Sequence, residues 1–196
     1  MRPSSRTAIL DAAFRLAGND DGAVEITFDA TAKEAGVTKG GVLYHFRTRQ
    51  ELVLAVVEYA AQRLEEAMLA RVGKPFEETT AAERVRAYVS VIAAGRLTRA
   101  DLAVYTEGLA DPAYCVPWEM TLHRWLSLDD VTDPAERARL RIAQLAADGL
   151  WSAEATDVFA PAKDRDAVIA QLIALTETPT PETPSPETPS PERSPT

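Results

Sequence analysis

The sequence has few of the residues that disulfides and membrane insertion require. Its 196 residues include one cysteine, Cys115, which cannot form a disulfide within the chain. No apolar stretch approaches the ~18 residues of a transmembrane helix, and no basic start followed by an uninterrupted apolar run indicates a signal peptide. We therefore expect a soluble, cytoplasmic protein that has no membrane partner.

Motifs for catalysis are also missing. The sequence has no nucleophile elbow, no glycine loop for phosphate and no paired cysteines, and its two histidines, His45 and His123, fall in different predicted domains. Glu119 and His123 are four residues apart on a predicted helix, but a metal site needs further ligands. We expect no enzyme activity, no metal and no cofactor.

Excess positive charge is absent as well, because the formal net charge is −9. Such a chain does not bind nucleic acid through its overall charge. Residues 1–50 nevertheless contain seven Lys and Arg against six Asp and Glu, so this part differs from the acidic remainder. Any contact with DNA must come from a local basic surface.

Residues 34–46 have the pattern of two helices joined by a tight turn. Gly36 can adopt the positive φ that ends a helix, Val37 is an apolar residue between two helices, and Thr38 can cap the next helix. That helix would begin at Lys39 and carry two glycines in its first turn, each of which costs roughly 1 kcal/mol in helix propensity. The pattern predicts a helix-turn-helix.

The flanking residues extend this pattern. Thr27 can cap a helix over 28–35, and residues 48–51 form a capping box for a following helix. The run AGVTKGGVLYHF at 35–46, followed by TRQEL at 48–52, resembles the DNA-binding domain of TetR-family regulators over about residues 5–60. This resemblance implies a three-helix head that binds double-stranded DNA.

A recognition helix contacts base edges mainly through its N-terminal residues, while surrounding basic and hydroxyl groups contact phosphates. The resemblance implies that Tyr44 and His45 contact phosphates and that Arg49 occupies a usual lysine position, with Val42, Leu43 and Phe46 in the core. An ordinary solvated surface is the alternative. The predicted DNA-binding residues are Thr27, Lys33, Thr38, Lys39, Gly40, Gly41, Tyr44, His45 and Arg49.

The rest of the chain predicts an all-α protein. Apolar residues recur at helical spacing, no segment alternates like a strand, and about nine helices are expected in total. We predict a DNA-binding domain at 1–50, a helical ligand-binding and dimerisation domain at 51–175, and a disordered tail rich in Pro, Thr and Glu at 176–196. The predicted helices beyond the motif cover about 52–72, 80–95, 98–110, a segment from Pro112 interrupted at Pro117, 134–151 and 162–175.

Aromatic residues of the second domain are candidates for a ligand cavity, or for ordinary core. They are Tyr88, Tyr105, Tyr114, Trp118, Trp125 and Trp151. A cavity among them would be mostly apolar and would suit a hydrophobic small molecule. The last two helices leave an apolar stripe that a second subunit could cover, and the predicted dimer-interface residues are Leu145, Gly149, Leu172 and Ile173.

The sequence thus predicts a homodimeric, ligand-responsive transcription regulator. We expect a repressor that a small, largely apolar effector releases from a palindromic DNA operator. The alternative is a helical DNA-binding adaptor or structural protein that senses no small molecule. An enclosed pocket in the second domain would favour the first interpretation, and a filled core would favour the second.

Overall fold

The computed structural model describes residues 5–18 and 26–177, and the described part is entirely helical, which confirms the predicted all-α class. It contains nine α-helices and one short 3-10 helix, with no strand among the described residues. The helices are α1 (Ser5–Ala17), α2 (Phe28–Ala35), α3 (Lys39–His45), α4 (Arg49–Val72), the 3-10 helix η1 (Phe76–Glu78), α5 (Ala81–Ala93), α6 (Arg99–Ala110), α7 (Pro112–Leu126), α8 (Pro134–Thr156) and α9 (Arg165–Ala174).

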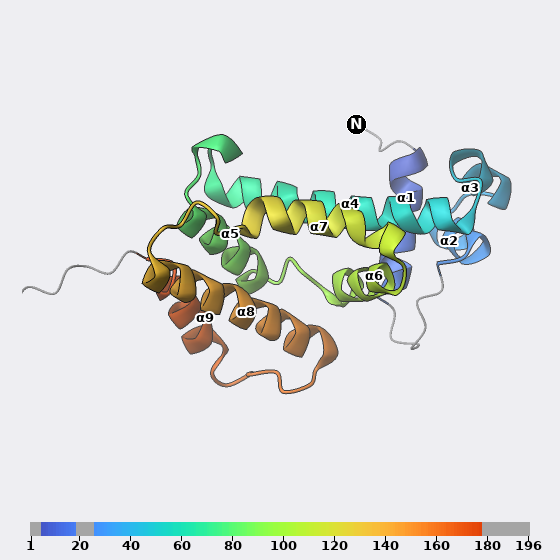
Figure 1. Cartoon of the computed structure of the whole chain (residues 1–196). Helices are drawn as coiled ribbons and strands as arrows, with labels where there is room; N and C mark the ends of the chain where they lie inside the picture. Colours follow the sequence, from blue (N-terminus) through green and yellow to red (C-terminus); the bar gives the residue numbers. More distant parts are fainter. Residues whose placement is uncertain (1–4, 19–25, 178–196) are drawn as a thin grey trace, which may run out of the picture.

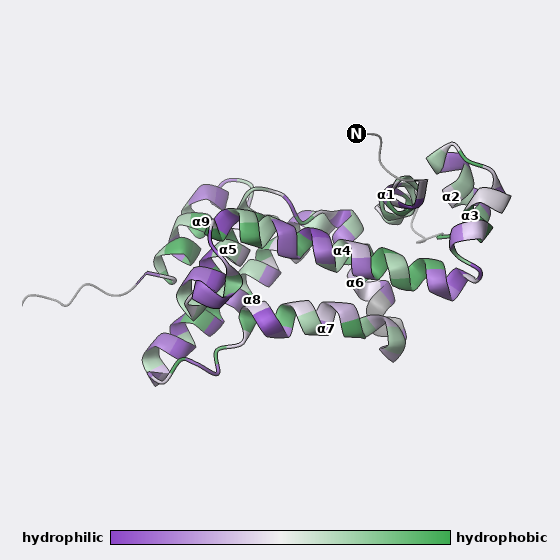
Figure 2. Ribbon diagram, turned by 90° about the horizontal axis from the view of Figure 1, so that it is seen from above, coloured by the Kyte–Doolittle hydropathy of each residue, from purple (hydrophilic) through white to green (hydrophobic). Residues whose placement is uncertain are grey.

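The helices form a small head and a larger body that share the long helix α4 (Figure 1). Helices α1, α2 and α3 surround the start of α4, and α7 packs along its remaining length. Helices α5, α8 and α9 make up the far end of the body, while α6 packs against both α7 and α1. The view from above shows the head clearly set apart at one end of α4 (Figure 2).

Local chemistry explains why several helix limits match the prediction. The hydroxyls of Thr27, Thr38 and Thr80 each accept a backbone N–H of the first helical turn. The capping box of Thr80 and Glu83 is complete. The one predicted at Thr48 is not, because the Glu51 carboxylate accepts the N–H of Arg47 at 2.8 Å instead of that of Thr48.

Two predicted limits and one predicted helix interruption are wrong. Helix α8 continues to Thr156 because no helix-breaking residue follows Trp151, and it ends where Asp157 adopts a φ of 56°. Helix α7 runs uninterrupted through Pro117, which removes a single backbone donor near the start of the helix. Thr176 is buried and accepts a hydrogen bond from Arg86 Nε at 2.9 Å, so the body extends past the predicted start of the tail. The remainder of the predicted tail, 178–196, lies outside the described residues.

A continuous apolar core runs from the head into the body along α4. Its head part includes Ile9, Val42 and Phe46, all buried. Leu43 was predicted to join them, but it is 39% exposed because it lies on the outer face of α3. Each large side chain that is fully buried contributes about 1.5–3 kcal/mol to the free energy of folding. Because this core continues along α4 from the head into the body, α4 holds the two parts together as one folded unit.

Candidate DNA-binding surface and ligand pocket

The turn between α2 and α3 is fixed by backbone bonds. Gly36 has a φ of 66°, a conformation that favours glycine, and its N–H donates to Lys33 O at 3.3 Å. The next N–H, that of Val37, donates to Ala32 O at 3.0 Å. Thr38 then caps α3 by accepting the Gly41 N–H at 3.0 Å. These bonds set the direction in which α3 leaves the head.

The start of α3 and its outer face are exposed. Thr38, Lys39 and Gly40 lie open to solvent, and Tyr44 is 84% exposed. Lys39 Nζ is 2.9 Å from Asp29 Oδ2, with both side chains largely exposed. Exposed ion pairs contribute little, so the Lys39 ammonium could exchange this carboxylate for a phosphate.

The two glycines of α3 are not required by packing inside the protein. A Cβ on Gly40 would have nothing nearer than the Thr38 hydroxyl oxygen at 3.8 Å, and one on Gly41 would have the same oxygen at 3.4 Å. Their cost in helix propensity therefore needs another explanation. Because Gly40 is exposed, a close approach of DNA to the backbone of α3 is such an explanation.

Other predicted contact residues have structural partners of their own. His45 Nε2 lies 2.8 Å from Ser5 Oγ, which joins α3 to α1. Arg49 Nε donates to Ile26 O at 3.1 Å, and its terminal nitrogen lies 3.4 Å from Glu107 on α6. Arg49 thus connects the head to the body, and removing it would disturb more than a contact with DNA.

The remaining two predicted residues complete this surface. Thr27 is half-buried and caps α2 by accepting the Ala30 N–H at 3.2 Å. Lys33 is exposed in the last turn of α2. The structure thus places eight of the nine predicted DNA-binding residues on α2, α3 and their flanking turns, with Thr27 and Thr38 engaged in helix capping, and the ninth, Arg49, at the start of α4.

The body contains an aromatic pocket of about 220 Å³ between α4, α5, α6, α7 and α8. The ring of Tyr105 meets Trp118 edge-on, with the ring centroids 5.8 Å apart, and lies 6.3 Å from Trp151. The lining residues are Leu64, Tyr88, Leu102, Tyr105, Trp118, Leu122, Asp148, Trp151 and Ser152. Four of the six predicted aromatic residues therefore line one pocket.

The other two predicted aromatic residues are core. Trp125 is fully buried, meets Phe76 edge-on at 5.1 Å and donates its Nε1 proton to Glu65 at 3.3 Å. Tyr114 is also buried and is not among the lining residues. Their prediction as ligand-binding residues does not agree with the pocket, because neighbouring side chains already cover them.

Asp148 and Trp118 supply polar groups to the pocket. The Tyr88 hydroxyl donates to the Asp148 carboxylate. Burial raises the pKa of Tyr88 well above its ordinary value, so the phenol stays protonated as a donor. Desolvation raises the pKa of Asp148, and the Tyr88 hydrogen bond opposes that shift. The Trp118 indole N–H is buried and has no partner among the described residues.

Sequence reasoning missed the other five lining residues, among them the polar Asp148 and Ser152. Asp148 stands between Ala147 and Gly149 in a segment that is otherwise apolar nearly all round. Such an acidic residue, three positions before a pocket tryptophan on the same helix, is a signal that could have identified it.

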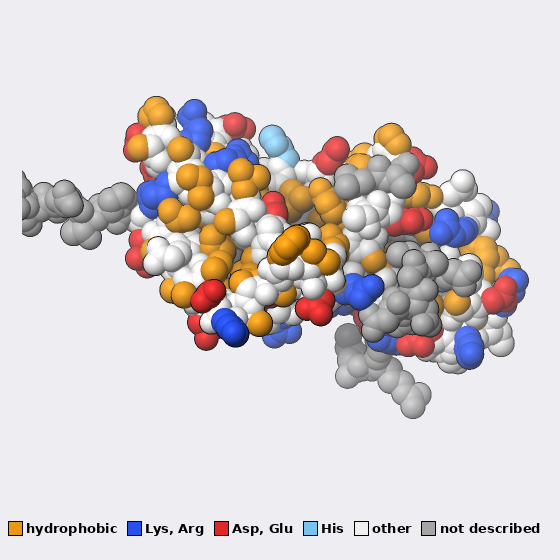
Figure 3. Space-filling view, turned by 90° about the horizontal axis from the view of Figure 1, so that it is seen from below, with side chains coloured by type: hydrophobic (Ala, Val, Ile, Leu, Met, Phe, Trp, Pro, Cys, Tyr) orange, Lys and Arg blue, Asp and Glu red, His pale blue; other side chains and the backbone are white. Residues whose placement is uncertain are grey.

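The predicted dimer residues do not share one surface. Leu145 is 64% exposed, and Gly149 and the apolar Ile142 are exposed on the same face of α8. Figure 3 shows hydrophobic side chains gathered on the underside of the body, where α8 lies. Leu172 is only 3% exposed because α9 packs on α5 and α8, so its assignment to an open stripe is wrong. Ile173 is half-buried.

A helix-turn-helix with an exposed recognition helix, joined to a helical body, defines a DNA-binding transcription regulator. The family described as "Bacterial regulatory proteins, tetR family" matches residues 9–56, and "Tetracyclin repressor-like, C-terminal domain" matches residues 82–177. The chain belongs to the TetR family, whose members are DNA-binding regulators and not enzymes.

Solved structures share the fold. A TetR-family member from Streptomyces coelicolor, SCO1917, is 23% identical with a TM-score of 0.60, and the match covers 90% of this chain and 100% of that one. The multidrug binding protein EbrR in complex with ethidium is 24% identical with a TM-score of 0.57, covering 89% and 99%. EbrR in complex with malachite green is 21% identical with a TM-score of 0.59, covering 90% and 100%.

The comparison with curated protein sequences gives no match. Within residues 5–18 and 26–177, no helix is both long and apolar enough to cross a membrane.

Proposed function

We propose that this protein is a homodimeric, cytoplasmic repressor that a small, largely apolar effector releases from a palindromic operator. The observation that carries the proposal is that α4 joins two sites in one chain. Its first residue, Arg49, is itself a predicted DNA-binding residue and contacts Ile26 of the head and Glu107 of α6, and its Leu64 lines the aromatic pocket. An effector in the pocket therefore touches the helix that holds the head.

The pocket lining supports an aromatic, largely apolar effector. Rings of Tyr105, Trp118 and Trp151 offer flat apolar surfaces, while the Trp118 N–H can donate to an acceptor and the Asp148 carboxylate can accept from a donor or attract a positive group. EbrR structures with ethidium and with malachite green give a chemical precedent for such molecules in a protein of this fold.

To release the protein from DNA, the effector must bind more tightly to the dimer conformation in which the spacing of the two heads does not fit the operator. A hundred-fold loss of operator affinity corresponds to a preference of about 3 kcal/mol. The same coupling must act in both directions, so operator DNA must weaken effector binding by the same factor. The adaptor alternative assigns the pocket no ligand and is disfavoured by the unpartnered, buried Trp118 N–H at its wall.

We expect footprinting of the DNA upstream of the protein's own gene to reveal a protected palindrome. Ethidium serves as the probe: it should quench tryptophan fluorescence and weaken operator binding, and Trp118→Ala should reduce that weakening by about tenfold while sparing operator affinity. The control is Met120→Ala, on an exposed position of the same helix. Absence of any protected site contradicts operator binding, and an intact ethidium response in Trp118→Ala places the effector elsewhere.

For the dimer, we propose the exposed face of α8 as the interface, with Leu145 near its centre. Leu145→Glu should give monomers, because it places a charge in a contact that two copies form around a twofold axis. Val116→Glu introduces the same charge at an exposed apolar position of α7 and should leave the dimer intact. Light scattering distinguishes the two outcomes, and a dimeric Leu145→Glu protein would move the interface away from α8. Leu172 is unsuitable for this test, since its substitution would disrupt the protomer core.

A further inference from the structure

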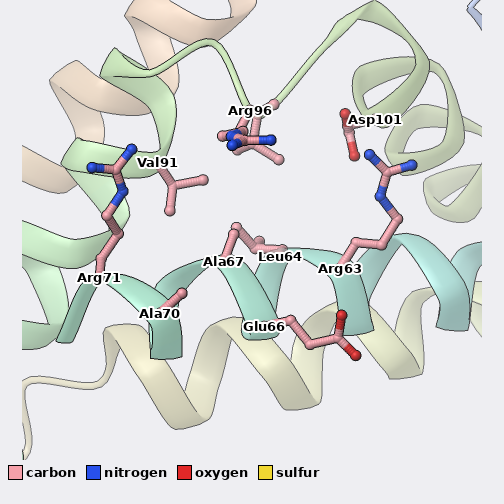
Figure 4. A pocket seen from close by; sticks show the side chains of 10 residues that line it. Arg63, Leu64, Glu66, Ala67, Ala70, Arg71, Val91, Arg96 and Asp101 are labelled. Carbon is pink, nitrogen blue, oxygen red and sulfur yellow. The ribbon is translucent and has the colours of Figure 1, made fainter. Parts of the chain in front are cut away.

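A second and larger cleft, of about 520 Å³, lies beside α4, whose Leu64 also lines the aromatic pocket. It is bounded by α4, α5, the α5–α6 segment and the start of α6. Three arginines stand around it, Arg63 and Arg71 on α4 and Arg96 after α5, and their side chains surround a floor of small and apolar residues (Figure 4). Among the cleft's other lining residues are two carboxylates, Asp101 and Glu66.

The backbone fixes the three arginines on one cleft. Arg63 and Arg71 are eight residues apart on α4, which places them two turns apart on the same helix face. Gly95 has a φ of 63°, and its N–H donates to Ile92 O at 2.8 Å while that of Arg96 donates to Val91 O at 3.1 Å. This helix end turns the chain so that Arg96 faces α4 across the cleft.

Both carboxylates of the cleft already have partners. Asp101 is buried and accepts the Thr98 N–H at 2.7 Å and the Thr98 hydroxyl at 2.8 Å. Glu66 accepts the side-chain amide of Gln62 at 2.8 Å. Neither forms an ion pair with Arg71 or Arg96 in the described part of the chain. The cleft therefore keeps more positive charge than its own carboxylates neutralise.

The arginines differ in how they are held. The Arg63 guanidinium lies 4.5 Å from the centre of the Phe14 ring and 5.7 Å from that of Tyr59, and it points toward the Asp101 carboxylate (Figure 4). Arg71 and Arg96 make no side-chain hydrogen bond or ring contact within residues 5–18 and 26–177. Their planar groups can each give two parallel hydrogen bonds to a carboxylate or phosphate.

We propose that this cleft is a binding site for a small organic anion that carries a phosphate or carboxylate group, held between Arg71 and Arg96. Its volume falls in the range of small-molecule sites. Its charge separates it from the aromatic pocket, whose wall is largely apolar and whose charged group is the acidic Asp148. The site does not depend on the proposed operator or effector, because it requires only the body and helix α4.

Isothermal titration of the full-length protein with pyrophosphate and with citrate, at constant ionic strength, tests the site. At least one probe should bind saturably with one site per protomer. The double variant Arg71→Gln/Arg96→Gln should weaken that binding by about tenfold or more, because charge-assisted bidentate bonds are lost. Both positions are exposed, so the melting temperature should stay unchanged.

Arg86→Gln is the matched control, since it removes one guanidinium from the same domain outside the cleft. It should bind the probe as the parent protein does. Failure of both probes to bind saturably overturns the site. An equal loss of affinity in the control and the double variant also overturns the site, because it would show that the probe responds to the overall charge of the protein.

Discussion

Replacing Arg84 with methionine should lower the free energy of unfolding by about 3–5 kcal/mol, the range for removing one partner of a buried ionic network. Arg84 is buried on α5, and its guanidinium donates to three backbone carbonyls at 3.1–3.2 Å and to both Asp130 oxygens at 3.1 Å. Methionine fills a similar volume but leaves these acceptors without a donor. The carbonyls belong to Thr79, Trp125 and Ser127.

Asp130→Asn is the matched control for Arg84. The Asp130 side chain is 56% exposed, so weakening its ion pair should cost less than about 1 kcal/mol while the three carbonyl bonds remain. Urea unfolding of both variants, followed by circular dichroism, gives the comparison. Equal costs for the two substitutions would show that the carbonyl bonds contribute nothing beyond the ion pair.

The Arg84 network also frames the aromatic pocket. It ties α5 to the end of α7 and to the segment that precedes α8, and these three helices provide Tyr88, Trp118 and Trp151. A rigid frame of this kind keeps the rings in place before a ligand arrives, which reduces the entropy lost on binding.

Local signals in the sequence were sufficient for the turn between α2 and α3. Gly36 has a positive φ, and Thr27 and Thr38 cap helices through hydrogen bonds to residues three positions later. Each of these residues therefore determines the structure of its own segment without help from distant parts of the chain. The helix limits of α2 and the start of α3 were predicted to the residue for that reason. The TetR-family resemblance added the expected roles of exposed residues, which local chemistry alone could not supply.

Which side chains are buried by other helices in the folded protein could not be predicted in the same way. Trp118 and Trp125 are seven residues apart on one face of α7, yet the first lines the pocket and the second is covered by Phe76 of the 3-10 helix. Leu145 and Leu172 both lie on apolar helix faces, and only the packing of α9 on α5 and α8 distinguishes the exposed one from the buried one. The spacing of the residues in the sequence does not predict which other helix packs on either member of these pairs.

The double variant Lys39→Gln/Tyr44→Phe should bind the operator about a hundred-fold more weakly than the parent protein. Each residue occurs twice in a dimer, so four contacts are lost, and a hundred-fold change, about 2.7 kcal/mol, corresponds to about 0.7 kcal/mol for each contact, within the range of about 0.5–1.5 kcal/mol for the net contribution of a hydrogen bond. Both side chains are exposed, so neither substitution should change the melting temperature. Arg49 is a poorer choice, because it also bonds Ile26 O and Glu107.

The single variants should differ in their salt dependence, which makes the assignment specific. Lys39→Gln removes a cation and should flatten the slope of log affinity against log salt by about two units per dimer, whereas Tyr44→Phe removes only a neutral hydroxyl and should leave the slope unchanged. Lys163→Gln, an exposed lysine of the segment between α8 and α9, serves as the charge control and should change neither quantity. Fluorescence anisotropy on the footprinted duplex at several salt concentrations measures both. A parent-like slope in Lys39→Gln would place this lysine away from the phosphates, and parent-like affinity in Tyr44→Phe would do the same for the tyrosine hydroxyl, because each change alters one interaction and leaves the fold intact.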